Sequence, residues 1–371
     1  MRRFPQLDGL RAVAALTIFA THAAMLQGVT GTNWIGVLTA RLNSGVAIFF
    51  VLSGFLLYRP WVAARLRGAE APDIGRYALH RAVRILPAYW AVLVILGVAQ
   101  ADLVPGVFGD HWWAYFGLLQ VYDVDTILRG IGPAWSLATE LAFYVALPFV
   151  ALLTARLLER RGRAQQVRFE LAGLAASAAL AFLVRDIAAR GHWMVTFDNT
   201  LIGRWPWFAA GLALAVVSVA REDRPAPVRA GWAGWVVAAG ALVIAMAILP
   251  RNVFTMTAAD QQWELLLFGV MAVGLMAPLL LGRADGVSPI ALLRHPVAIW
   301  LGTISYGVFL WHYPIIRWTI AHTGGAPSVV VALLSLAITL VIATVSWYGL
   351  ERPLLRRVRR ERRPAPRAAP A

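Results

Sequence analysis

Long apolar segments recur along the whole chain, and each is long enough to cross the hydrocarbon core of a bilayer as an α-helix. Backbone groups in lipid must satisfy their hydrogen bonds within the protein, so such segments are expected to pack as a helical bundle. The composition agrees, because 60% of residues are hydrophobic and only 14% are charged. The predicted fold class is therefore all-α, a polytopic membrane helix bundle. We predict ten transmembrane helices, at residues 10–27, 44–60, 85–101, 133–155, 170–187, 202–220, 230–250, 263–282, 297–317 and 327–350.

The arginine distribution predicts the orientation of this bundle. The net charge of +15 is the balance of 34 basic residues, all of them arginine, against 19 acidic residues. Most of them fall in alternate loops and at the two ends of the chain, which places both termini in the cytoplasm. Basic residues that gather in the loops on one side of a membrane are not typical of a nucleic-acid-binding face. The arginines expected outside, or near the outer boundary, are Arg41, Arg129, Arg185, Arg190, Arg204, Arg251 and Arg317.

The remaining segments define the domain organisation. The first helix lacks a convincing cleavage site, so we interpret it as uncleaved and the protein as a multi-pass component of the inner or plasma membrane. The aromatic stretch 112–122 is too short for an eleventh helix and is expected to be interfacial or re-entrant. Residues 1–355 are predicted to form one integral-membrane domain, and 356–371 a polybasic, disordered cytoplasmic tail.

Ionisable residues within the apolar segments are the candidate functional groups, because lipid does not solvate them. Arg11 and His22 are eleven residues apart, which places them on one face of a helix about 16 Å apart along its axis. Glu140 lies about two turns into another predicted helix. A cytoplasmic loop carries Arg76, and Arg81 and Arg84 follow three residues apart on one helix face.

Two further polar residues are expected to have structural roles. Ser53 stands beside Gly54 and is expected to make a small-residue packing contact between helices. His312 lies among Trp311, Tyr313 and Pro314, and we interpret it as part of the aromatic belt at the outer interface. The histidines show no metal-ligand spacing, and cysteine is absent, so no metal site is predicted.

Five motifs in this chain resemble the integral-membrane acyltransferase family 3, which contains bacterial O-antigen, peptidoglycan and antibiotic-tailoring O-acyltransferases. The resemblance extends from Leu7 to Pro353, nearly the whole chain. The motifs, in order, are Leu7-Asp8-Gly9-Leu10-Arg11-Ala12 with His22; Phe49-Phe50-Val51-Leu52-Ser53-Gly54-Phe55; Arg81 and Arg84 leading to Ile85-Leu86-Pro87; Trp135-Ser136-Leu137 with Glu140; and Ser305-Tyr306-Gly307 with Trp311-His312.

The resemblance implies transfer of an acyl group, commonly acetyl, from acyl-CoA to a carbohydrate-type hydroxyl. The family's paired arginine and histidine fall on Arg11 and His22. Some members carry a C-terminal esterase-like domain, which does not follow the last helix of this sequence. This favours direct transfer within the bundle, or a separate extracytoplasmic partner.

The chemistry of such a reaction gives the charged residues their expected roles. Imidazole suits deprotonation of a hydroxyl near neutral pH, so His22 is the expected general base. Arg11 is expected to hold the donor or polarise its carbonyl, while Arg76, Arg81 and Arg84 bind the phosphates of acyl-CoA, with acetyl-CoA as the expected donor. Glu140 is expected either to orient His22 or to pair with an arginine.

The sequence also fits a second class of function. A transporter or flippase of a glycan or lipid-linked sugar also has many helices with buried charge, and it needs no acyl-CoA. Among acyltransferases, the acceptor is either a cell-surface carbohydrate or glycolipid, or a small glycosylated metabolite such as a macrolide.

Overall fold

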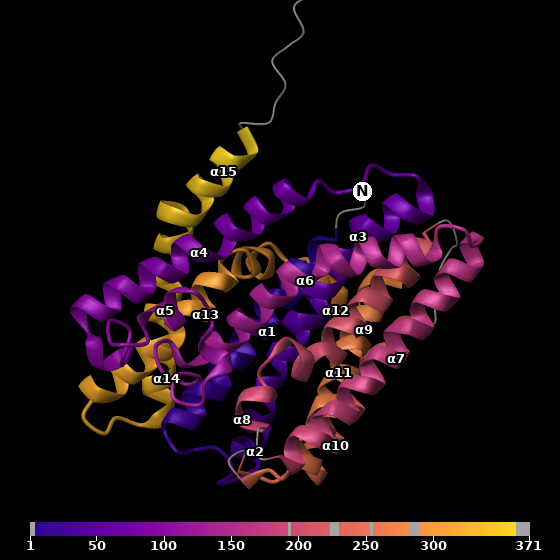
Figure 1. Cartoon of the computed structure of the whole chain (residues 1–371). Helices are drawn as coiled ribbons and strands as arrows, with labels where there is room; N and C mark the ends of the chain where they lie inside the picture. The colour runs from indigo at the N-terminus through magenta and orange to yellow at the C-terminus, as the bar shows by residue number, and fades with distance from the viewer. Residues whose placement is uncertain (1–3, 192–193, 223–229, 253–254, 282–288, 361–371) are drawn as a thin grey trace, which may run out of the picture.

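The computed structural model of the protein describes residues 4–191, 194–222, 230–252, 255–281 and 289–360, and these contain helices and no strands (Figure 1). The predicted all-α class is therefore confirmed. The long helices are α1 (Pro5–Leu26), α3 (Gly45–Arg67), α4 (Ile74–Ala99), α6 (Trp135–Leu158), α7 (Arg163–Arg190), α9 (Leu201–Ala220), α10 (Ala230–Ile248), α11 (Ala258–Leu281), α13 (Pro296–His322) and α14 (Ser328–Ser346). The short ones are α2 (Trp34–Arg41), α5 (Trp112–Phe116), α8 (Met194–Phe197), α12 (Pro289–Leu293) and α15 (Arg352–Arg360).

Each predicted apolar segment overlaps one of the long helices. Within the described residues, eight helical stretches are long and apolar enough to cross a membrane. Helices α10 and α13 are not among those eight: the apolar part of α10 is short, Trp232–Ile248, and α13 carries polar and aromatic residues along its length. The protein is thus a multi-pass membrane protein, while the number ten stays a prediction.

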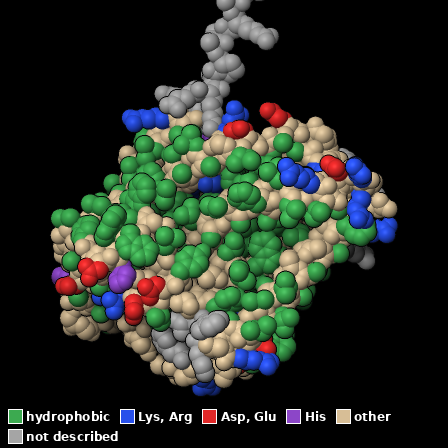
Figure 2. All heavy atoms as spheres, in the orientation of Figure 1, with side chains coloured by type: hydrophobic (Ala, Val, Ile, Leu, Met, Phe, Trp, Pro, Cys, Tyr) green, Lys and Arg blue, Asp and Glu red, His purple; other side chains and the backbone are tan. Residues whose placement is uncertain are grey.

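Lipid-facing surfaces are visible on the outside of the bundle. Figure 2 shows a broad band of hydrophobic side chains, with most charged side chains above and below it. Helix α6 contributes a row at four-residue spacing, Val145, Phe149, Leu153 and Leu157, each more than half exposed. Large apolar side chains exposed in this periodic way are expected where a helix faces hydrocarbon rather than water.

Glycines bring the central helices close together. Helices α1 and α13 run in the same direction, and a Cβ on Gly302 would lie 1.8 Å from the Asp8 carbonyl oxygen. Helices α3 and α9 meet in a similar way, because a Cβ on Gly54 would lie 2.6 Å from the Phe208 carbonyl oxygen. Close backbone approach at small residues is the usual way in which membrane helices pack. The small-residue contact predicted for Ser53 is therefore made by its neighbour Gly54.

The ends of the chain and its aromatic loop complete the fold. The stretch 112–122 forms α5 and a 3₁₀ turn, Gln120–Tyr122, and does not cross the bundle. At the other end, a π-helical segment, Trp347–Glu351, leads into α15, which continues to Arg360. The first residues of the predicted disordered tail, 356–360, are therefore helical, and 361–371 lie outside the described residues.

Candidate active site

A cavity of about 770 Å³ lies between α1, α3, α4, α6 and α13. Its lining includes the first residues of α1, such as Pro5 and Leu7. The N-terminus and α15 lie at the same end of the bundle (Figure 1). Its wall is apolar for much of its extent, with side chains such as Ile18, Phe49 and Phe309. The charged residues that line it are Asp8, Arg11, Arg81, Arg84 and Glu140. Four of the six predicted site residues thus surround one cavity.

The arginines of α4 reach the cavity because this helix begins earlier than predicted. The Asp73 side chain accepts a hydrogen bond from the Arg76 backbone N–H and caps the helix, so the expected loop is the first turns of α4. Arg81 and Arg84 then lie three residues apart on its cavity-facing side. Arg76, one turn earlier, is exposed and is not among the lining residues.

Two of the three cavity arginines have carboxylate partners. Arg11 donates to Asp8 at 2.8 Å, and Arg84 donates to the buried Glu351 at 3.4 Å. The Arg84 guanidinium also lies over the Tyr306 ring, 5.6 Å from its centroid. The Tyr306 hydroxyl donates to the Ile85 carbonyl and holds α13 against α4 at this position.

Arg81 is the cavity arginine whose charge is not compensated. Among the described residues it makes no ion pair, and its buried Nε has no hydrogen-bond partner. Its guanidinium lies 5.7 Å from the centroid of the Tyr144 ring. A buried guanidinium donor without an acceptor costs free energy, and an anionic ligand would satisfy it.

Glu140 contacts hydroxyl groups rather than an imidazole. Its carboxylate accepts hydrogen bonds from Ser53 Oγ and, at 2.7 Å, from the Tyr144 hydroxyl. No hydrogen bond joins it to His22 in the described structure. Ser53 therefore has a polar role at the cavity wall in addition to its position beside the α3–α9 contact.

His22 lies outside the cavity lining and contacts His312. The Nδ1 atom of His22 is 2.9 Å from Nε2 of His312, and its ring packs edge-on against Tyr313. His312 is only 1% exposed, so its interpretation as an interfacial belt residue is wrong. The pair adjoins the cavity, because the lining residues Ile18 and Phe309 lie about one helical turn before His22 and His312.

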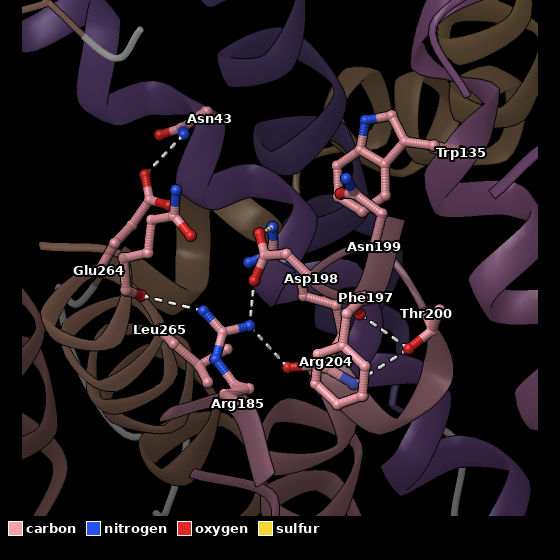
Figure 3. A network of polar contacts seen from close by, with 12 residues as sticks. Asn43, Trp135, Arg185, Phe197, Asp198, Asn199, Thr200, Arg204, Glu264 and Leu265 are labelled. Atoms are coloured by element: carbon pink, nitrogen blue, oxygen red, sulfur yellow. Dashed lines mark hydrogen bonds and ion pairs between the residues drawn. The ribbon is translucent and has the colours of Figure 1, made fainter. Parts of the chain in front are cut away.

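A second cluster of buried charges, seen from close by in Figure 3, lies where α8 and the start of α9 meet α7 and α11. Figure 1 shows α8 at the opposite end of the bundle from α15. Arg185 contacts Asp198 and donates to Gln262 at 3.0 Å, and Arg204 donates to Asp198 at 2.5 Å. Glu264 accepts from Asn43 at 2.9 Å. We refer to Asn43, Arg185, Asp198, Arg204, Gln262 and Glu264 as the outer network.

The outer network supports the helix that carries Glu140. The Arg204 guanidinium lies 5.3 Å from the centroid of the Trp135 ring, at the start of α6. One turn further, the Thr139 hydroxyl contacts the carbonyl oxygen of Asn199, the residue after Asp198. These contacts fix α6 at the position immediately before Glu140, so they act on the cavity through structure.

Sequence reasoning missed several of these residues for identifiable reasons. It placed Arg185 and Arg204 outside or near the outer boundary, but it did not predict that their side chains are buried within the bundle, at 0% and 6% exposed. The nearby Asp198 was the available signal, since buried arginines require an anion. His312 was recognised as part of a motif, but its pairing depends on how α1 and α13 pack. No group of three or more potential metal ligands occurs among the described residues.

Comparisons with known proteins cover nearly the whole chain. The model of a family described as "Acyltransferase domain" matches residues 4–348. The chain is 25% identical to Peptidoglycan O-acetyltransferase OatA of Listeria monocytogenes, over 94% of this chain and 55% of the relative. It is also 25% identical to Putative peptidoglycan O-acetyltransferase YrhL of Bacillus subtilis, over 95% and 55%.

A third relative has a similar length. Acyltransferase MdmB of Streptomyces mycarofaciens is 27% identical, over 100% of this chain and 96% of the relative. The chain thus spans about half the length of the two peptidoglycan relatives and nearly all of the third. No solved structure matches the chain.

Proposed function

Because this chain belongs to the acyltransferase family whose model spans residues 4–348, we propose that it transfers an acyl group from acyl-CoA to a hydroxyl of a carbohydrate or glycosylated acceptor. The observation that carries the donor part of this proposal is the uncompensated Arg81 in a charged cavity. The names of two relatives, peptidoglycan O-acetyltransferases, support an acetyl group and a carbohydrate acceptor.

The donor fits the cavity by charge and by polarity. Phosphates of CoA carry negative charge and several acceptor oxygens, which match the forked donors of Arg81 and Arg11. Arg11 and Arg84 each share their charge with a carboxylate, Asp8 and Glu351, so Arg81 contributes most. The apolar wall near Ile18 and Phe309 suits the uncharged arm and the acyl end of the donor. This orientation directs the thioester toward the two histidines.

The transfer then requires one base and no covalent enzyme intermediate. His22 accepts the proton of the acceptor hydroxyl as the oxygen attacks the thioester carbonyl carbon. The new C–O bond forms, the C–S bond breaks, and the CoA sulfur leaves with the proton returned from the imidazolium. The products are the ester and free CoA thiol. Neither Cys nor Ser is needed as a nucleophile in this scheme, which agrees with a chain without cysteine.

Release of CoA thiol provides a direct test. The chain contains no cysteine, so a thiol-reactive dye reports only CoA formed from acetyl-CoA. The purified full-length chain is incubated with acetyl-CoA and, separately, a muramic-acid-containing peptidoglycan fragment or a macrolide. We expect acceptor-dependent thiol release that is lost in His22→Ala and retained in His322→Ala, an exposed histidine on α13.

The same preparation distinguishes an acyltransferase from a transporter. A ligand that binds only the folded state raises the unfolding temperature by mass action. We expect acetyl-CoA to raise it, and Arg81→Gln to remove most of the shift. If acetyl-CoA and longer acyl-CoAs cause no shift and no thiol is released, the donor assignment is wrong and transport becomes the better explanation.

A further inference from the structure

We propose that His312 is a positioning residue that fixes the tautomer of His22, in the place where an acidic residue orients the base of a catalytic triad. The inference rests on the proposed function, because it assigns a role to the partner of its general base. The hydrogen bonds of the two rings determine which nitrogen of each histidine donates and which accepts, and these assignments give His312 its role.

Two backbone carbonyl groups determine the tautomer of His312. Its Nδ1 lies 2.7 Å from the carbonyl oxygen of Phe309 and 3.1 Å from that of Val308. A carbonyl oxygen only accepts, so Nδ1 of His312 carries a hydrogen and donates it. In a neutral ring the other nitrogen, Nε2, then has a free lone pair.

The tautomer of His312 in turn determines the tautomer of His22. Because Nε2 of His312 accepts, the hydrogen between the rings belongs to Nδ1 of His22, 2.9 Å away. In the neutral His22 ring, Nε2 is then the unprotonated nitrogen. No described residue hydrogen-bonds this Nε2, and the side chain is only partly buried. The lone pair of the proposed base is therefore left available for a substrate proton.

The surroundings of the pair favour this neutral arrangement. The aromatic neighbours of the two rings are Phe19, Phe309 and Tyr313, and none of the hydrogen bonds of either imidazole in the described residues goes to a carboxylate. A lasting positive charge at this depth would need an anionic partner. During the reaction, the imidazolium formed on His22 retains its Nδ1–H bond to His312, and its new Nε2 proton passes to the leaving thiolate.

Helix packing explains why the pair meets. Helices α1 and α13 are parallel, and Gly302 allows their backbones to touch at Asp8. From that contact both helices extend toward the histidines, so the register set at the glycine determines which side chains face each other further on. Local backbone bonds lock the His312 ring, and His312 in turn orients the less buried His22 ring.

Three variants and one spectrum test the assignment, using the full-length protein and the thiol-release assay with acetyl-CoA. His312→Leu removes the accepting nitrogen, and we expect kcat to fall about 10- to 100-fold with the KM for acetyl-CoA unchanged. His312→Gln offers an amide oxygen near the former Nε2, and we expect it to recover most of the lost kcat. His322→Leu is the control, since His322 makes the same kind of local bond, to Trp318, but is exposed.

Nitrogen-15 NMR of histidine-labelled protein reports the tautomer of His22, which would not depend on His312 if His312 served only in packing. The His22 signals are assigned by their loss in His22→Ala. We expect a protonated Nδ1 and an unprotonated Nε2 in the wild type, and a change of tautomer in His312→Leu. If His312→Leu fails to fold, His312→Gln and the wild-type spectrum still decide the question.

The outcomes separate the two proposals. If the wild type releases no thiol, the proposed acyl transfer is wrong. If His22→Ala retains turnover, His22 is not the base, and His312 then has no base to position. If His22→Ala abolishes turnover while His312→Leu keeps kcat within about twofold, the positioning role alone is wrong. A wild-type His22 protonated at Nε2 also overturns it.

Discussion

The cavity and the outer network are both built from arginines and carboxylates, but they use their charges differently. In the outer network, Asp198 lies between Arg185 and Arg204, and each guanidinium finds a carboxylate oxygen (Figure 3). In the cavity, Arg81 has no such partner among the described residues. Buried charges that satisfy each other hold helices together, whereas an unsatisfied charge beside a cavity is available to a ligand. Whether a buried charge has a partner therefore says more about its role, structural or ligand-binding, than its burial does.

The largest expected effect is on stability and concerns the outer network. Asp198→Ala leaves Arg185 and Arg204 without their common anion, and we expect a loss of about 3–5 kcal/mol. The measurement is the unfolding free energy, or the unfolding temperature, of the purified protein. Asp186→Ala is the matched control, because Asp186 pairs with Arg190 on the exposed side of α7 and should cost less than about 1 kcal/mol. Equal losses in the two variants would contradict the structural role of the network.

The next effect is on donor binding and concerns the cavity. Arg81→Gln removes a charge that no described carboxylate compensates, so we expect a stability change below about 1 kcal/mol. The KM for acetyl-CoA should rise about 10- to 100-fold, because a charged hydrogen bond contributes about 1.5–3 kcal/mol. Arg156→Gln, an exposed arginine of α6, serves as control. A destabilised protein with unchanged KM would show that Arg81 is structural, as Arg185 is.

A smaller effect of opposite sign is expected at Glu140. The amide of Glu140→Gln still accepts from Ser53 and Tyr144, so its stability should change by less than about 1 kcal/mol. Removing a negative charge from the cavity wall reduces repulsion of the donor phosphates. We expect the KM for acetyl-CoA to fall about two- to fivefold, on the order of 0.5–1 kcal/mol for charges that do not touch. A higher KM would indicate that Glu140 positions the donor directly.

An effect of similar size is expected on stability, at the contact that links the two regions. Thr139→Val removes the hydroxyl contact between α6 and Asn199, and we expect a loss of about 1 kcal/mol. Thr344→Val is the control, because within the described residues the Thr344 hydroxyl bonds only to the Leu340 carbonyl of its own helix. Thermal unfolding of both variants makes the comparison. If they are equally stable, the outer network does not support α6 through this contact.

The sequence predicted the positions of the helices better than the contacts between them. Apolar length is a local property, so every predicted segment overlaps an observed helix. The boundaries were less accurate: α4 begins at Ile74 rather than residue 85, because Asp73 caps a polar turn that hydropathy does not detect. The helix face that the spacing of Arg81 and Arg84 predicted is therefore part of α4 itself.

The sequence by itself determined that this chain is a membrane helix bundle of an acyltransferase type, and it identified the charged residues that require an explanation. Only the tertiary structure decided which of them meet. His22 and His312 are separated by 290 positions in the chain, and Arg185 reaches Asp198 and Gln262 from a different helix. Such pairings depend on where helices approach closely, as at Gly302, and on the register that this contact imposes. Periodicity places a side chain on a face of its own helix, whereas packing selects the side chain opposite it.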